Sequence, residues 1–255
     1  MLLDTFRPGF GLALLLAGAV QFTPVTAQAE GLRYSVGLYA GAASSPFVNE
    51  NDDAEGFLAP DFLIEGERFS FGTSGLTYDI FETDSFGLSA RLAPRFVSSD
   101  PTDVAGLERL KKDIAVEAGL AARLTYGQVE LGVEALKDVS DTHDGMAVTA
   151  SVGTMFQISD RFGIGARVGA TWMDQKLATY TYGVSASEAG GGIAAYSVKD
   201  SVIPSIGIDV SYALTENTTV IGSLSAEFLP NSVTASPIVK NDNVVSAMVG
   251  LRYAF

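Results

Sequence analysis

Apolar and polar side chains alternate along most of the chain after residue 30. In the segment 113–126 every second residue is apolar, and the set comprises Ile114, Val116, Ala118, Leu120, Ala122, Leu124 and Tyr126. Successive side chains of a β-strand point to opposite faces of the sheet, so a period of two predicts a strand with one apolar and one polar face. Similar segments cover roughly 32–42, 86–92, 129–135, 145–158, 162–172, 202–214, 218–229 and 244–255.

The length of these segments favours a membrane barrel over a soluble β-protein. Strands of globular proteins average about 5–6 residues, whereas a tilted strand that crosses a bilayer needs about 9–11. In such a barrel the apolar face contacts lipid and the polar face fills the lumen, and the sheet closes because lipid cannot satisfy an open strand edge. The alternative is a soluble sandwich or lipocalin-type barrel, in which the apolar face points inward.

The strand count depends on the stretch from Phe57 to Phe81. Phe62, Ile64 and Phe69 favour strand there, whereas Gly66 and the run 72–75 (Gly-Thr-Ser-Gly) favour turns. The stretch holds either one long bent strand or an additional hairpin. We therefore expect an all-β fold, a transmembrane antiparallel up-and-down β-barrel with an even number of strands, ten to twelve.

The connections between the expected strands alternate in length. Short links lie at 82–85, 126–128, 159–161 and 215–217, and longer polar or glycine-rich links lie at about 43–57, 98–112, 139–144, 175–200 and 230–243. Outer-membrane barrels place short turns in the periplasm and long loops outside. The alternation is therefore consistent with a last strand that ends in the periplasm.

The first 29 residues are typical of a secretory signal peptide. The apolar run Phe10–Val20 is too short for a spanning helix, which needs about 20 residues. Arg7 precedes it, and the small-x-small pattern 27–29 (Ala-Gln-Ala) predicts cleavage before Glu30. We expect two units, a cleaved signal peptide at 1–29 and a barrel domain at 30–255.

Composition removes several classes of function. The 255 residues contain 16 Lys plus Arg against 30 Asp plus Glu, a net charge of −14, which is the wrong sign for binding nucleic acid. The chain has no cysteine and one histidine, His143, so thiolate and multi-histidine metal sites are absent. We expect no cofactor, no metal site and no catalytic residue.

The end of the chain resembles the sorting signal of outer-membrane proteins. Leu251, Tyr253 and the terminal Phe255 share one face of the last strand, with apolar residues at the alternate positions before them. The resemblance implies recognition by the barrel-assembly machinery, through strand pairing. Together with the signal peptide, it indicates the outer membrane of a Gram-negative-type bacterium, with outer-membrane lipid around the barrel.

The register assigns the charged residues of the strands to the lumen. The set is Arg91, Arg95, Glu117, Arg123, Glu130, Glu134, Arg167, Asp209, Glu227 and Arg252. Its acids and bases balance, and we expect opposite charges to pair and fill a narrow barrel, although they would also suit a solute path. We assign the aromatic residues Trp172, Tyr180, Tyr182 and Phe228 to the membrane interfaces, where an amphipathic ring is favoured.

Several strings resemble the MipA/OmpV family. They are 141–145 (Asp-Thr-His-Asp-Gly), 180–184 (Tyr-Thr-Tyr-Gly-Val), 188–189 (Glu-Ala), 236–239 (Ser-Pro-Ile-Val) and 250–255 (Gly-Leu-Arg-Tyr-Ala-Phe), with 67–69 (Glu-Arg-Phe) and 75–76 (Gly-Leu) before them. The resemblance spans roughly 32–255 and is most specific in the C-terminal half. At 180–182 the chain differs, because the family more often has adjacent tyrosines.

The resemblance implies an outer-membrane barrel that acts as a non-enzymatic scaffold. Its partners would be two murein-remodelling enzymes, a lytic transglycosylase and a penicillin-binding synthase. The alternatives are a narrow porin-like channel for small solutes, favoured by the glycine-lined polar face, and a surface adhesin or antigen. A hydrolase built on His143 and its flanking carboxylates is a weaker hypothesis, because Asp and Gly are ordinary turn residues and no serine motif accompanies them.

Overall fold

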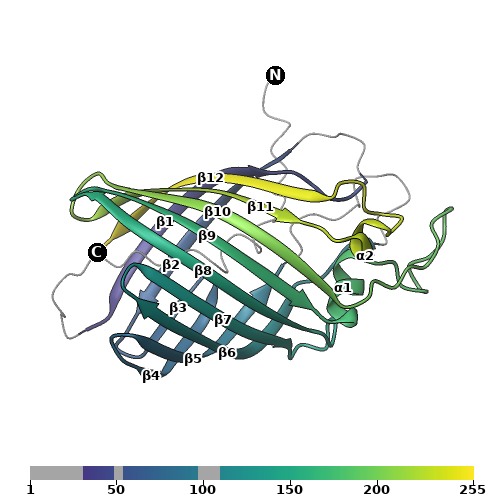
Figure 1. The fold of residues 1–255 in the computed structure, drawn as a ribbon, viewed down its shortest axis with the longest axis horizontal. Coiled ribbons are helices and arrows are strands. Elements are labelled where there is room, and N and C mark those ends of the chain that lie inside the picture. The colour runs from purple at the N-terminus through teal and green to yellow at the C-terminus, as the bar shows by residue number, and fades with distance from the viewer. Residues whose placement is uncertain (1–30, 49–53, 97–109) are drawn as a thin grey trace.

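The computed structural model describes residues 31–48, 54–96 and 110–255, and these form a closed antiparallel barrel of twelve strands (Figure 1). Each strand pairs with its neighbours in the chain, and the last strand pairs with the first. The expectation of an even-numbered, up-and-down antiparallel barrel is confirmed. The proposed signal peptide lies outside the described residues, and no helix in the described part of the chain is long and apolar enough to cross a membrane.

The elements follow one another with few interruptions. The strands are β1 Arg33–Ala43, β2 Glu55–Glu65, β3 Phe69–Gly72, β4 Gly75–Glu82, β5 Phe86–Arg95, β6 Ala115–Tyr126, β7 Val129–Asp138, β8 Met146–Ser159, β9 Phe162–Met173, β10 Ser201–Ala213, β11 Thr218–Phe228 and β12 Asn243–Ala254. Two helices, α1 (Gln175–Tyr182) and α2 (Asn231–Thr234), lie in the links that follow β9 and β11.

The apolar face of each strand points outward and the polar face points inward. On β6, Leu120 is 51% exposed while Glu117 on the opposite face is 1% exposed. The same alternation leaves valine, leucine and phenylalanine side chains exposed on every long strand. This arrangement is the reverse of a soluble barrel, so the lipocalin-type alternative is excluded.

The ambiguous stretch 57–81 is the additional hairpin. β2 is followed by a short pair, β3 and β4, joined by a turn at Thr73 and Ser74. Gly72 and Gly75 flank this turn, and a Cβ atom on either would collide with a backbone oxygen of β2 or β5. The glycines that indicated turns therefore allow the hairpin to fit between β2 and β5, and the strand count is twelve.

Apart from the turn of the β3–β4 hairpin, long and short connections lie at opposite ends of the barrel, and α1 and α2 lie at the long-loop end (Figure 1). We assign the short-turn end to the periplasm. The links 175–200 and 230–243, which were expected as polar or glycine-rich loops, contain helices. Asp174 caps α1 by accepting a hydrogen bond from the Leu177 amide, and a bridge joins Val184 to Tyr196.

The buried apolar core of the protein lies in the external mouth rather than along the barrel. Inward side chains at the outer ends of the strands meet α1, α2 and the loops, and the cluster comprises Phe47, Leu110, Ala147, Met173, Leu177, Ala178, Tyr182, Val184, Val198, Ile203, Leu229, Val233, Ile238 and Val239. These residues come from four of the long links and from the outer ends of β8, β9 and β10. The cluster therefore crosses the mouth, and we call it, together with α1 and α2, the cap.

Replacing Leu120 by arginine tests the membrane orientation of the strands. Leu120 lies on the outward face of β6, and a lipid-facing arginine near the bilayer midplane costs about 2–4 kcal/mol. We expect L120R to lower the free energy of unfolding from lipid vesicles by that amount, measured by urea titration. The inward-facing control A121S is expected to change it by less than about 0.5 kcal/mol. Equal losses in both variants would contradict the assigned orientation.

Candidate functional site

Ion pairs link neighbouring and next-neighbour strands across the inner face of the barrel. Arg91 on β5 contacts Glu134 on β7 at 3.1 Å, Arg167 on β9 contacts Asp209 on β10 at 3.4 Å, and Arg252 on β12 contacts Asp61 on β2 at 2.8 Å. All six side chains are at most 23% exposed. Hydroxyl groups add to them, because Arg91 donates to Thr77 and Ser223 donates to Asp209.

The other expected lumenal charges lie nearer the two mouths or have no partner. Arg123 pairs with Glu82 at 2.9 Å at the periplasmic end, where both side chains are half exposed. Glu130 and Glu227 have no ion-pair partner within the described residues. The inner face also holds Asp61, Glu82 and Asp138, which the sequence register had not assigned to it. Carboxylates therefore outnumber guanidinium groups, and the expected balance of charge is wrong.

A buried polar cluster lies beneath the cap, at the outer ends of β5, β6 and β7. Arg95 donates to Glu117 at 2.6 Å, and the His143 Nε2 atom lies 3.4 Å from the same carboxylate oxygen. Asp138 accepts hydrogen bonds from the amides of His143 and Asp144 at 2.6 and 2.9 Å. The Asp138 carboxylate thus orders the turn that holds the only histidine.

This geometry does not support the hydrolase hypothesis. The His143 Nδ1 atom accepts a hydrogen bond from the Gly145 amide at 3.0 Å, so it cannot donate to an orienting carboxylate as a catalytic histidine does. The imidazole is fully buried, and Glu117 and Tyr180 lie against it. Asp141 and Asp144 adopt positive φ angles of 56°, in keeping with the turn role expected for this segment.

A second polar contact joins α1 and the link after it to the residues just before β6. Lys112, whose side chain is 4% exposed, donates to Glu188 at 2.7 Å and lies over the ring of Tyr180. The Tyr180 hydroxyl donates to the backbone oxygen of Asp113. Burial raises the pKa of Glu188, but hydrogen bonds from Lys112 and Ser185 outweigh burial and hold that pKa below its usual value.

The structure separates the four aromatic residues that were assigned to the interfaces. Trp172 on β9 and Phe228 on β11 lie on the outward face, where Phe228 is 45% exposed. Tyr180 and Tyr182 belong to α1, and Tyr182 is buried in the cap beside Phe47. The assignment of these two tyrosines to the membrane interface is wrong, because the chain turns into a helix after β9 and folds its aromatic side chains into the mouth.

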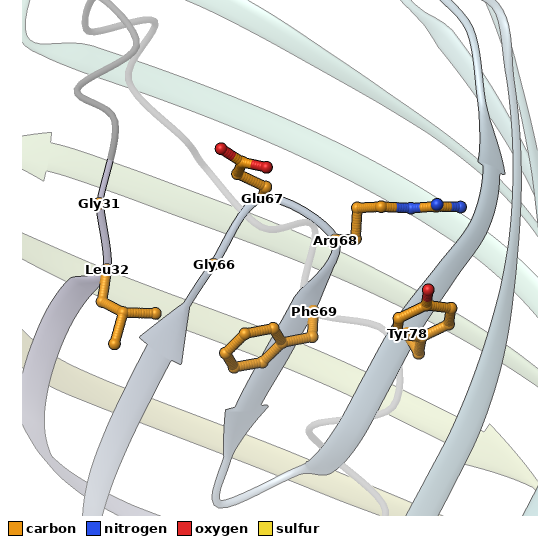
Figure 2. Close-up of a pocket in the computed structure, with 7 residues that line it drawn as sticks. All are labelled: Gly31, Leu32, Gly66, Glu67, Arg68, Phe69 and Tyr78. Carbon is orange, nitrogen blue, oxygen red and sulfur yellow. The ribbon is translucent and has the colours of Figure 1, made fainter.

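An open pocket of about 470 Å³ lies on the periplasmic rim (Figure 2). Leu32 precedes β1, Phe69 begins β3 and Tyr78 lies on β4, and these three side chains form its apolar lining. Gly31, Gly66, Glu67 and Arg68 complete it. In Figure 2 the Phe69 ring lies between Leu32 and Tyr78, and the Glu67 side chain projects away from the apolar residues.

Arg68 holds the pocket in shape. Its guanidinium donates to the backbone oxygens of Asp79 and Ile80 at 2.7–3.1 Å, where β4 carries an irregularity in its pairing with β5. It also lies over the Tyr78 ring, 5.4 Å from the centroid. A Cβ atom at Gly66 would lie 2.5 Å from the Phe69 ring, so a larger residue there would displace this ring of the pocket.

Sequence reasoning missed Arg68, Lys112 and Asp61 as structural residues. Arg68 stands in a string that resembles the family, but its backbone partners are eleven and twelve residues away. Lys112 and Glu188 are separated by 76 residues, and Arg252 and Asp61 by 191. No local pattern signals such pairs. In the described part of the chain, no group of three or more His, Cys, Asp or Glu residues is placed to hold a metal ion.

The pairing of Lys112 with Glu188 predicts a cap that loosens in acid. Because the pKa of Glu188 is lower in the folded cap than in the unfolded segment, its contribution to stability is present above its ordinary pKa and is lost as the pH falls through the lowered value. We expect protease cleavage within 183–200 to rise as the pH falls below about 4. The variant E188Q should be cleaved faster than wild type at neutral pH and should show a smaller rise in acid. A wild-type cleavage rate independent of pH would contradict this role.

Comparison with known proteins places the chain among outer-membrane proteins. It is 26% identical to YiaT of Escherichia coli strain K12, over 91% of this chain and 95% of the relative. It is 25% identical to the MltA-interacting protein of the same strain, over 96% of this chain and 99% of the relative. It is 24% identical to a 24 kDa outer membrane protein of Pasteurella multocida, over 94% and 98% of the two chains.

Solved structures with similar folds are outer-membrane porins. The KdgM porin in complex with disordered oligogalacturonate matches with a TM-score of 0.46 and 9% identity, over 87% of this chain and 99% of that chain. The NanC porin matches with a TM-score of 0.47 and 10% identity, over 86% and 98%. At these values the likeness says nothing about function.

The family model described as MltA-interacting protein MipA matches residues 36–255. The match begins within β1 and includes the capped mouth, the inner ion pairs and most of the pocket on the rim. This chain, an outer-membrane β-barrel homologous to outer-membrane proteins, therefore belongs to the MipA family.

Proposed function

We propose that this barrel is a scaffold that docks a murein-remodelling enzyme on its periplasmic rim. The observation that carries the proposal is the preformed pocket of Leu32, Phe69 and Tyr78, whose shape is held by Arg68. An exposed apolar hollow at the edge of a rigid sheet offers a partner side chain a site that needs little reorganisation. In this proposal the barrel holds the enzyme at the membrane and catalyses no reaction itself.

The choice of partner rests on the family. A relative that aligns over nearly its whole length is named MltA-interacting protein. We therefore propose a lytic murein transglycosylase as the enzyme that docks, with a penicillin-binding synthase as a second member of the assembly. The periplasmic turns are short, so the contact is small and depends on a few side chains, as transient interfaces do.

The cap favours the scaffold function over the channel function. The apolar cluster of the cap lies in the external mouth, where a solute channel would need a polar lining. A second candidate remains, a narrow channel, because the inner face is polar, rich in glycine and carries an excess of carboxylates. If solutes pass, that excess favours cations over anions.

We also propose how the chain is exported and assembled in the outer membrane. Residues 1–29 would direct export from the cytoplasm of a Gram-negative-type cell and be removed. Leu251, Tyr253 and Phe255 would then be recognised by the barrel-assembly machinery. Leu251 and Tyr253 are exposed on the outward face of β12, and the Phe255 amide bonds to the Tyr34 oxygen where β12 meets β1. This placement at the closing seam suits a signal that is read by strand pairing.

Planar-bilayer recordings distinguish the scaffold from the channel. We expect the purified wild-type barrel to give no reproducible conductance steps at neutral pH. The variant L177D places a charge in the centre of the cap, where Leu177 is fully buried, and should loosen the cap because an unpaired buried charge is strongly unfavourable. Cation-selective steps are then expected. Reproducible steps from the wild-type protein would favour the channel.

Binding to a purified lytic murein transglycosylase tests the docking site. We expect the double variant L32S/E67K to bind at least about tenfold more weakly than wild type, measured by surface plasmon resonance with the barrel in nanodiscs. The control I158S alters another exposed apolar residue, at the periplasmic end of β8, and should bind as wild type does. Heat-modifiable migration verifies that each variant is folded. Equal binding by both variants would remove the rim pocket as the docking site.

A further inference from the structure

The turn after β7 holds the only histidine of the chain, and both ring nitrogens of this residue face other groups. The Nδ1 atom of His143 accepts a hydrogen bond from the Gly145 amide at 3.0 Å. A ring nitrogen that accepts carries no proton, so the proton of the neutral ring is on Nε2, which lies 3.4 Å from a Glu117 oxygen. The Gly145 amide thus selects a single tautomer of the neutral imidazole.

Gly145 connects this imidazole to α1. Its backbone lies so close to the first turn of α1 that a Cβ atom on Gly145 would be 2.5 Å from the Leu177 nitrogen and 2.6 Å from the Asp174 Oδ1 atom. These two atoms form the hydrogen bond that caps the helix. Leu177 is fully buried in the apolar cluster of the cap. A movement of Gly145 therefore displaces the helix at the centre of the cap.

The last turn of α1 rests on the imidazole itself. The Tyr180 ring packs on the His143 ring, with 5.3 Å between the two centroids. The Tyr180 hydroxyl donates to the Asp113 backbone oxygen, which holds the ring in this position. α1 therefore contacts the histidine turn twice, at Gly145 through its first turn and at His143 through its last.

The charges around the imidazole favour the uptake of a second proton. Glu117 and Asp138 both attract a positive ring, and Asp138 Oδ2 lies 4.0 Å from Nδ1, whereas Arg95 opposes the charge. Among the described residues, the charged and titratable groups that face the ring or its immediate contacts are Arg95 of β5, Lys112 and Asp113 before β6, Glu117 of β6, Asp138 of β7, Asp144 of the turn, Tyr180 of α1 and Glu188 after α1.

A second proton is incompatible with the contact between His143 and Gly145. Protonated Nδ1 is a donor, and it would face the Gly145 amide, which is also a donor, at 3.0 Å. The new N–H group finds an acceptor in Asp138 Oδ2 only if their separation closes from 4.0 Å to about 2.8 Å. The ring or the turn must therefore shift, and the buried Gly145 amide loses its acceptor, which is unfavourable.

We propose that His143 is a proton-sensitive latch of the cap. The neutral ring holds Gly145 and α1 in the closed arrangement, and the protonated ring releases them. The latch acts between about pH 8 and pH 5, where histidine is the side chain that ordinarily changes charge. The contact that closes the cap is thus present at the upper end of this range and is lost as the pH falls. The latch does not depend on the function proposed for the periplasmic rim.

Magnetic resonance of the full barrel in nanodiscs, prepared without a histidine tag, tests the proton uptake. Because the chain has one histidine, its labelled ring nitrogens give signals without overlap. We expect Nδ1 to gain a proton between pH 8 and pH 5, and the amide signals of Gly145 and Leu177 to shift along the same titration curve. The amide signal of Leu120, in the middle of β6, should not move.

Proteolysis of the link after α1 measures the release of the cap. In the variant H143N, the side-chain oxygen can replace Nδ1 as the acceptor for the Gly145 amide, and it takes up no proton. We expect wild type and H143N to be cleaved within 183–200 at equal rates at pH 8. At pH 5 wild type should be cleaved at least about tenfold faster, because cleavage follows the population of the open state. Comparison of the two proteins at each pH removes the pH dependence of the protease and of Glu188.

The variant H143A separates the latch from general damage to the cap. It lacks an acceptor for the Gly145 amide, so it should be cleaved faster than wild type at pH 8, and its rate relative to H143N should not rise further at pH 5. If H143N is itself loose at pH 8, the joint titration of the Gly145 and Leu177 signals in wild type decides.

Three results would overturn the latch. The first is an imidazole that gains no proton between pH 8 and pH 5. The second is proton uptake that leaves the Gly145 and Leu177 signals unchanged. The third is slower cleavage of wild type than of H143N at pH 5, which would mean that the proton tightens the cap.

Discussion

The requirement that backbone hydrogen bonds be satisfied without water governs this structure. A strand in lipid has no solvent to accept from its amides, so the sheet closes on itself and β12 pairs with β1. Closure in turn fixes which face of each strand meets the lipid, because a shift of one residue would move every apolar side chain inward.

Because the barrel is closed, the polar and charged groups of its inner face must form hydrogen bonds and ion pairs with one another. Arginines and carboxylates on neighbouring and next-neighbour strands pair along the inner face, and the cluster of Arg95, Glu117 and His143 continues them to the base of the cap. Above this level the chain builds an ordinary apolar core from loops and helices. The protein therefore resembles a membrane protein along its wall and a small soluble domain at its mouth, which is why its activity is expected at the rims rather than along a pore.

The difference between the strands of the wall and the folded loops of the mouth explains which residues were misplaced from the sequence. Tyr180 and Tyr182 follow a membrane strand and are aromatic, so they match the pattern of an interfacial belt. They lie in α1, however, and Tyr182 is buried against Phe47 from another loop. Lys112 and Glu188, likewise, form a contact between links that are far apart in the sequence. Side chains outside the strands obey no period of two, so their partners depend on how the loops fold together.

The sequence by itself determined the class of fold, the orientation of the strands and the inward position of most charges, because the period of two is a local property that each strand carries alone. It left the choice between ten and twelve strands open, because turn glycines in 57–81 are compatible with a bend or a hairpin. Only the tertiary structure decided the pairing of Asp61 with Arg252, the contacts of Arg68 with β4, and the cap. The pairing of Asp61 with Arg252 and the cap join residues that the closing of the barrel brings together, and closure is a property of all the strands at once.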